Sequence, residues 1–150
     1  MIKLALIRHC ESVGNIAFEM AFVQEDDAMY TDEFMRTPSS EWVLSEYGRN
    51  HAAQIGDYLK EKMTPDSVFV SETRRTMETA ELMGIPLNRL LITSFLRERD
   101  YAGLELRPKK DWLHCARNLN EAMRSLTWKP PGGESMEDVI HRAEDSLHNY

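Results

Sequence analysis

An arginine and a histidine, Arg8 and His9, stand side by side after a short apolar run near the start of the sequence. The guanidinium group of arginine presents a planar fork of donors that suits phosphate oxygens. A neutral imidazole is a competent nucleophile near its usual pKa of about 6.5. A second stretch with adjacent arginines, S-E-T-R-R-T-M-E-T-A, begins at Ser71. These residue types together indicate phosphoryl chemistry.

Both groups are expected at the ends of buried strands. Residues 2–7 form a nearly continuous apolar run, which is typical of a strand buried on both faces of a parallel sheet. Residues 67–70 and 90–93 are predicted as two further strands. Parallel strands bring their carboxyl ends to one edge of a sheet, where open α/β sheets place their chemistry. We therefore expect His9 to lie among arginines in a phosphate pocket.

Apolar stripes at helical spacing predict the helices that connect these strands. The stripes cover residues 45–62, 72–83, about 111–126, and 136 to the end of the sequence. Two short helices are expected within 16–36, broken near the acidic residues 25–27. Ser135 and Asp138 have the spacing of a capping box. The alternation of strands and helices over 150 residues favours one α/β domain.

Charge and composition exclude several classes of protein. The formal net charge of −7 argues against nucleic acid as a partner. Residues 16–41 hold seven acidic residues and one basic residue, so most of this charge lies in one segment. No apolar run approaches the length of a membrane span, and the first residues resemble neither a signal peptide nor an anchor. A soluble, cytoplasmic protein is expected.

The two cysteines, Cys10 and Cys115, do not form a C-x-x-C pair, so the sequence predicts no metal site and no cofactor. The pair His9-Cys10 invites comparison with the H-C-x5-R loop of cysteine phosphatases. The arginine of that loop falls six residues after the cysteine, where this sequence has Ile16. Cys10 is therefore not expected to be the nucleophile.

Five motifs in the chain follow one another in a known order. They are L-I-R-H-C-E-S-V-G-N, W-V-L-S-E-Y-G-R-N-H-A-A-Q, V-S-E-T-R-R-T-M-E-T-A, F-L-R-E-R-D-Y-A-G-L-E and P-P-G-G-E-S-M-E-D-V-I. This ordered set resembles the histidine phosphatase superfamily, also called the phosphoglycerate mutase-like family. The resemblance implies a three-layer sandwich with a mostly parallel sheet and helices on both faces.

The resemblance also implies roles for individual residues. His9 would accept the phosphoryl group as a phosphohistidine, and Arg8 and Arg75 would bind the phosphate oxygens. Glu98 matches the proton donor to the leaving oxygen. Asn15 matches a position near the phosphate pocket. No metal is required for this chemistry, and the implied partner is a small phosphorylated substrate or a phosphoprotein.

Three departures from the family pattern affect this interpretation. Cys10 replaces the usual glycine after the histidine. The acidic segment 16–41, expected to be a helical insertion, lacks the W-N-x-x-x-R-F-x-G-W stretch of the mutases, which favours a phosphatase. The family's second catalytic histidine follows the last helix, in an S-H-G motif on a further strand. Because the sequence ends at Tyr150 within that helix, we expect a domain over 1–150 that is incomplete at its C-terminus.

None of the other histidines (His51, His114, His141 and His148) is assigned to that missing role. The predicted function is a histidine acid-type phosphatase, a phosphomonoester hydrolase whose complete chain supplies the second histidine. Two alternatives stay open, a non-catalytic phosphate-binding or interaction module and a phosphoglycerate mutase. The natural substrate is not predicted, and an oligomer is compatible with the sequence.

Overall fold

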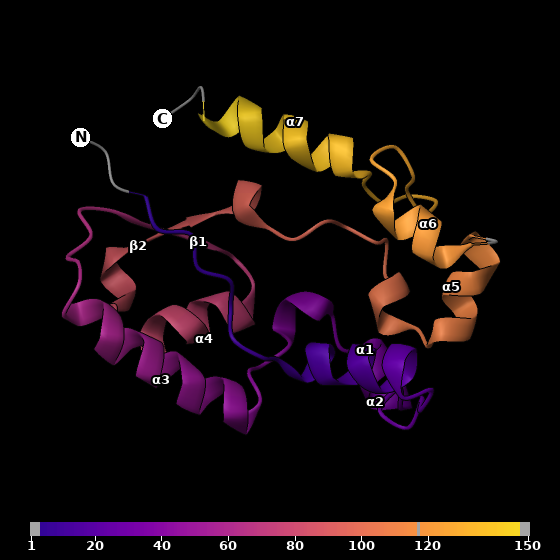
Figure 1. Ribbon diagram of the computed structural model, residues 1–150, viewed down its shortest axis with the longest axis horizontal. Helices are drawn as coiled ribbons and strands as arrows, with labels where there is room; N and C mark the ends of the chain where they lie inside the picture. Colours follow the sequence, from indigo (N-terminus) through magenta and orange to yellow (C-terminus); the bar gives the residue numbers. More distant parts are fainter. Residues whose placement is uncertain (1–3, 117, 148–150) are drawn as a thin grey trace.

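The computed structural model describes residues 4–116 and 118–147. Strands β1 (Val68–Ser71) and β2 (Leu90–Thr93) form a parallel sheet, and helices α3 (Glu46–Lys60) and α4 (Arg74–Leu82) pack together beside it. Helix α7 (Met136–Leu147) lies on the opposite side of the strands from α3 in Figure 1. The expected mixed α/β fold with a parallel sheet and helices is confirmed.

The two strands pair from Val68 opposite Leu90 to Ser71 opposite Thr93. Parallel neighbours need a crossover connection, which α4 and the short helix η2 (Leu87–Arg89) provide. The carboxyl ends of both strands therefore reach the same edge of the sheet. The strands predicted over 67–70 and 90–93 are confirmed to within one residue.

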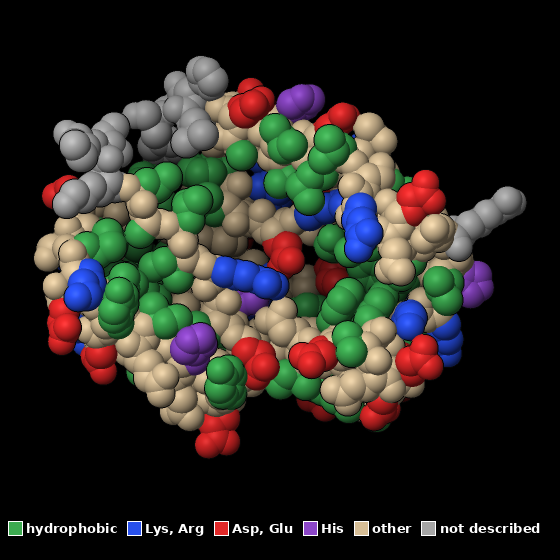
Figure 2. Space-filling view, in the orientation of Figure 1, with side chains coloured by type: hydrophobic (Ala, Val, Ile, Leu, Met, Phe, Trp, Pro, Cys, Tyr) green, Lys and Arg blue, Asp and Glu red, His purple; other side chains and the backbone are tan. Residues whose placement is uncertain are grey.

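The strand expected over residues 2–7 is absent from the described residues 4–7, which are irregular. Leu4 and Leu6 are 79% and 84% exposed. Strand structure in an apolar run is stabilised by ladder hydrogen bonds and by burial on both faces. Among the residues described, no strand is hydrogen-bonded to this segment. In Figure 2 apolar side chains gather on the side of the molecule where the strands lie.

The acidic region folds as two helices and a short turn, α1 (Val13–Val23), α2 (Asp32–Arg36) and η1 (Ser39–Glu41). The break between α1 and α2 falls where the acidic run predicted it, and Glu25 there has a positive φ of 58°. Ser12 and Thr31 cap the two helices through their side chains. Ala17, Ala21 and Tyr30 form a small buried core in this region.

The single helix predicted over 111–126 is wrong, because two helices occupy this region. Helix α5 (Lys109–Cys115) ends at Ala116, which has extended backbone angles, and α6 (Leu119–Arg124) begins after Asn118. The Asn118 side chain accepts a hydrogen bond from the N–H of Glu121 at 3.2 Å. Asparagine is a strong N-cap residue, so Asn118 starts a new helix rather than continuing the first.

Two short turns, η3 (Ser94–Leu96) and η4 (Leu104–Leu106), interrupt the segment between β2 and α5. The capping box predicted for α7 is confirmed. The N–H of Asp138 donates to Ser135 Oγ at 3.0 Å, and the N–H of Ser135 donates to the Asp138 carboxylate at 2.8 Å. No helix among the described residues has both the length and the apolar character needed to cross a membrane.

Candidate active site

His9 lies in the irregular segment 4–11, shortly before helix α1. This segment is tied to α4 through Thr79, whose hydroxyl accepts from the Cys10 N–H at 3.1 Å. The same hydroxyl donates to the carbonyl oxygen of Arg75 at 2.8 Å. One threonine on α4 therefore joins the backbone beside His9 to the backbone of Arg75.

Arg75 is the centre of the site. Its side chain is 7% exposed, and it donates three hydrogen bonds to groups from three separate parts of the chain. Its Nε donates to His9 Nε2 at 3.1 Å, its Nη1 to the Ser39 carbonyl at 2.7 Å, and its Nη2 to Glu98 Oε2 at 3.0 Å. A buried guanidinium needs such partners, because desolvation of an unpaired charge is costly.

These contacts define the protonation state of His9. Since Arg75 only donates, Nε2 of His9 must carry a lone pair. The other ring nitrogen, Nδ1, lies 2.7 Å from the Cys10 carbonyl oxygen, and a proton on Nδ1 satisfies that contact. His9 is therefore assigned as the neutral tautomer protonated on Nδ1, with Nε2 as its nucleophilic atom.

Electrostatics favour the same neutral form. Burial lowers the pKa of His9 below its usual 6.5, and the charges of Arg75 and Arg8 add to this effect. The hydrogen bond to the Cys10 carbonyl and the charge of Glu98 act in the opposite direction without reversing it. Burial disfavours a charged imidazole, and neighbouring cations do so as well.

Glu98 reaches the site from the segment that follows η3. Its carboxylate pairs with Arg75, but its side chain is 56% exposed. Arg8 is exposed beside His9, and it makes no hydrogen bond or ion pair with another described residue. The structure thus brings His9, Arg75 and Glu98 into direct contact and leaves Arg8 at the solvent side.

Asn15, expected near the phosphate pocket, takes part in the cap of helix α1. Its Oδ1 accepts from both the N–H and the hydroxyl of Ser12, each at 3.0 Å, and its own N–H donates to Ser12 Oγ at 3.4 Å, which completes the capping box of α1. No contact joins it to His9 or Arg75 within the described chain. The contacts of its side chain are therefore those of a helix cap.

The acidic segment 16–41 touches the site at its C-terminal end. The Ser39 carbonyl accepts from Arg75, and the Ser39 hydroxyl donates to Glu105 at 2.8 Å. Trp42 follows η1 and lies with its ring 6.0 Å from the Arg75 guanidinium carbon, within range of a cation–π contact. This segment forms one wall around Arg75.

Ser39, Trp42 and Thr79 are residues of this arrangement that the sequence did not predict. A backbone carbonyl such as that of Ser39 has no sequence signature. Thr79 stands four residues after Arg75, one helical turn along α4, and this spacing could have indicated its role. Burial raises the pKa of the Cys10 thiol, which agrees with its exclusion as a nucleophile. The described residues include no cluster of three or more potential metal ligands.

The fold and this arrangement can now be compared with known proteins. The chain belongs to the histidine phosphatase superfamily (branch 1), whose family model matches residues 4–150. Fructose-2,6-bisphosphatase TIGAR B of Danio rerio is 32% identical over 133 residues, which are 85% of this chain and 51% of that protein. The 2,3-bisphosphoglycerate-dependent phosphoglycerate mutase of a Bradyrhizobium strain is 35% identical over 112 residues, 67% of this chain and 52% of that protein.

A solved structure supports the same fold. The mycobacterial glucosyl-3-phosphoglycerate phosphatase in complex with VO3 superimposes with a TM-score of 0.69 at 22% identity, over 94% of this chain and 63% of that chain. The chain therefore spans about half the length of these curated relatives and about two thirds of the solved one. The relatives include both phosphatases and mutases.

Proposed function

We propose that this chain carries the phosphoryl-binding part of a phosphomonoester hydrolase of the acid phosphatase type, acting through a phosphohistidine on His9. The observation that carries the proposal is the bridge made by Arg75, which contacts His9 Nε2 and Glu98 Oε2 at once. A phosphoryl group held by Arg75 would lie between the nucleophile and the acid. Arg8, exposed beside His9, would complete the positive surroundings of the phosphate oxygens.

The proposed reaction has two steps. In the first, Nε2 of His9 attacks phosphorus, the N–P bond forms, and the bond to the ester oxygen breaks. Glu98, which takes up a proton from solvent once the substrate phosphate displaces it from Arg75, gives this proton to the leaving oxygen, while the Nδ1 proton stays in the hydrogen bond to the Cys10 carbonyl. In the second, a water molecule that loses its proton to Glu98 attacks phosphorus, and the N–P bond breaks to release inorganic phosphate. Arg75 and Arg8 stabilise the charge on the equatorial oxygens in both steps.

Substrates of this site would be small phosphomonoesters or phosphoproteins. We further propose that residues 1–150 form one histidine phosphatase domain, continued in the complete protein, with 16–41 as an acidic insertion. The superfamily's second histidine would come from that continuation. His51 and His114 have other contacts, with the Tyr47 ring and with the Lys110 carbonyl. A cytoplasmic location is part of the proposal, and the two free cysteines agree with it.

The test is hydrolysis of p-nitrophenyl phosphate by the complete protein. We expect phosphate release by the wild type and its loss in His9→Ala, with His51→Ala as the matched control. Enzyme denatured at alkaline pH, where the N–P bond survives, should retain label from a phosphoryl-labelled substrate on His9. Release that continues unchanged in His9→Ala would contradict the proposal. A phosphoglycerate mutase, the activity of the Bradyrhizobium relative, would instead move phosphate within phosphoglycerate without net release.

A further inference from the structure

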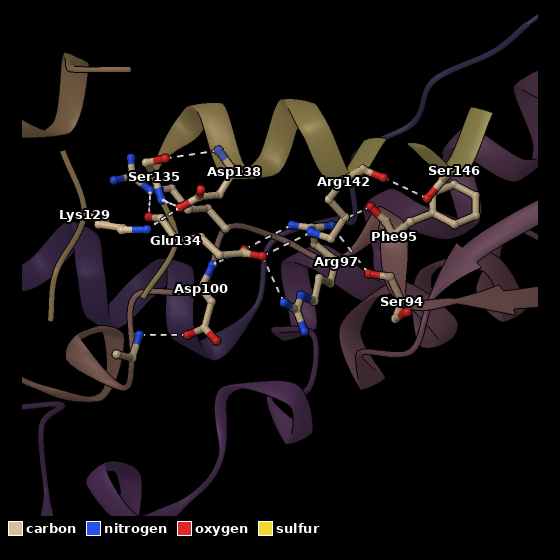
Figure 3. Close-up of polar contacts among 12 residues, drawn as sticks. Ser94, Phe95, Arg97, Asp100, Lys129, Glu134, Ser135, Asp138, Arg142 and Ser146 are labelled. Carbon is tan, nitrogen blue, oxygen red and sulfur yellow. Dashed lines mark hydrogen bonds and ion pairs between the residues drawn. The ribbon is translucent and has the colours of Figure 1, made fainter. Parts of the chain in front are cut away.

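A second polar cluster lies behind the segment that carries Glu98. At its centre is Glu134, the residue before Ser135 at the start of α7, shown in Figure 3. Its Oε1 accepts from Arg97 Nη2 at 2.9 Å and from Arg142 Nε at 3.1 Å. Its Oε2 accepts from the Asp100 N–H at 3.0 Å and from Arg142 Nη2 at 3.1 Å. Arg142 thus binds the carboxylate of Glu134 in a bidentate way, through Nε and Nη2, and such pairs are strong and fix the relative orientation of the two groups.

The backbone of Glu134 binds the same segment. Its N–H donates to the Asp100 carbonyl at 2.8 Å, and its carbonyl accepts from Arg99 Nε at 2.8 Å. Glu98 stands between Arg97 and Arg99, so both of its neighbours are bound to Glu134. The chain on either side of Glu98 is therefore fixed to the start of α7.

Arg142 extends this attachment toward strand β2. While its Nε and Nη2 bind Glu134, its Nη1 donates to the Phe95 carbonyl at 2.6 Å. It also donates to the Arg97 carbonyl at 3.3 Å. One ion pair thus fixes the backbone from Phe95 to Asp100, and Figure 3 shows both side chains directed at this segment from the α7 side.

We propose that Glu134, together with Arg142, is a positioning residue that holds Glu98 against Arg75. The proposal rests on the function proposed above, in which Glu98 protonates the leaving oxygen. Glu98 is more than half exposed, and its only described partner in the site is Arg75. The hydrogen bonds that join Glu134 and Arg142 to Arg97 and Arg99 restrict the backbone on both sides of Glu98, which the single contact of the Glu98 side chain cannot do. Such preorganisation keeps an acid within reach of the reacting atoms.

The charge state of Glu134 suits this role. Partial burial acts to raise its pKa, but the hydrogen bonds from Arg97, the Asp100 N–H and Arg142 prevail and lower the pKa to about 2. Glu134 is therefore a carboxylate throughout the neutral range. A glutamine at this position would have one carbonyl oxygen and one NH2 group. The NH2 group is itself a donor, so it could not accept the hydrogen bonds from Arg97, Arg142 or the Asp100 N–H.

The pKa of His9 distinguishes the two roles, because it would not change if Glu134 only stabilised the fold. The charges that face His9 are those of Arg75, Arg8 and Glu98, and of these three charges only that of Glu98 raises the pKa of His9. A Glu98 that leaves its position should therefore lower the His9 pKa. Glu98→Gln should do so directly, Glu134→Gln indirectly, and the double variant should show no further shift. The measurement is the NMR titration of the His9 ring in the full chain.

The matched control is Asp138→Asn. Asp138 caps the same helix and pairs with Lys129, but it contacts no residue between Ser94 and Asp100 in the described structure. Its replacement should leave the His9 titration at the wild-type position, although it also removes a carboxylate close to Glu134. Arg142→Lys is the second test variant, because lysine keeps the charge and loses the fork. It should shift His9 in the direction of Glu134→Gln.

In the hydrolysis assay, we expect Glu134→Gln to lower kcat about tenfold with little change in KM, since only the proton transfer is affected. A Glu134→Gln and an Arg142→Lys variant that both fold and titrate His9 as the wild type does would overturn the proposal. Should Glu134→Gln fail to fold, Arg142→Lys decides. If the wild type hydrolyses no phosphomonoester, the proposed function fails, and the His9 titration still decides the role of Glu134.

Discussion

The Nε–H group of Arg75 donates a hydrogen bond to the lone pair on His9 Nε2, with 3.1 Å between the two nitrogens. The positively charged group of the site is therefore in direct contact with the nucleophilic atom. This contact keeps His9 neutral and protonated on Nδ1, but it also occupies Nε2, the atom that has to attack phosphorus. An arriving phosphoryl group must therefore take over the Nε donor of Arg75 before His9 can react. Substrate binding and release of the nucleophile are the same event in this geometry.

Replacement of Arg75 should be far more damaging than replacement of its neighbour. Arg75→Met removes three donors from the site, and loss of a single such donor typically costs a factor of about 10²–10³ in rate. We expect at least that loss in kcat/KM for p-nitrophenyl phosphate. Arg74→Met, at an exposed position on the same helix, is the control and should retain activity. Equal losses in the two variants would mean that Arg75 has no special role.

The ring of His9 should titrate below 6.5, because burial and the two arginines disfavour its charged form. Arg75→Met should raise this pKa, since a neighbouring cation is removed, whereas Glu98→Gln should lower it. The measurement is an NMR titration of the ring carbon-bound protons. The acidic limb of the pH profile of kcat/KM should follow the same midpoint. A midpoint at or above 6.5 in the wild type would contradict the arrangement of charges described here.

Acid should weaken the fold through Glu134. Its pKa is lowered in the folded state from an ordinary 4.5 to about 2, so the folded chain binds its proton less readily than the unfolded chain does. The resulting stabilisation is fully present above about pH 4.5 and is lost as the pH falls toward 2. Thermal unfolding at a series of pH values should show this decline. In Glu134→Gln the decline should be shallower, with a lower stability at neutral pH.

Gly48 on α3 is expected to tolerate no side chain. A Cβ atom at this position would lie 2.1 Å from the backbone carbonyl oxygen of Glu11, two residues after His9. Backbone cannot move aside as the end of a flexible side chain can, and overpacking of this kind costs about 1–3 kcal/mol. Gly48→Ala should lower the free energy of unfolding in urea by that amount. Asn50→Ala, exposed on the same helix, should leave it nearly unchanged.

The regular elements that the sequence predicted well are those with a local signal. Helix α3 has an apolar stripe, β2 is bounded by turn residues, and α7 begins with the reciprocal Ser135–Asp138 cap. Residues 4–7 have an equally clear apolar pattern and yet form no strand. Pattern predicts what a segment can become, but a strand also needs a hydrogen-bonded neighbour, and no local signal reports on that.

The site divides in a similar way. The family motifs led to His9, Arg75 and Glu98, and the structure brings these three side chains together, while their catalytic roles stay proposals. Asn15 is found in a helix cap, a role that Ser12-x-x-Asn15 also permits. The Ser39 carbonyl could not be predicted, because any residue has such a group and only the path of the acidic segment directs this one at Arg75.

The partners of Arg75 are widely separated along the chain, with His9 66 positions away, Ser39 36 and Glu98 23. No short stretch of polypeptide can reproduce this pocket, so an unfolded chain has no equivalent site for a phosphate group. Whatever oxyanion occupies it therefore binds the native state alone. By mass action, inorganic phosphate or vanadate at a hundred times its dissociation constant would add about 2.7 kcal/mol to the free energy of unfolding. Ligand affinity and thermal resistance are thus two measures of one equilibrium in this molecule.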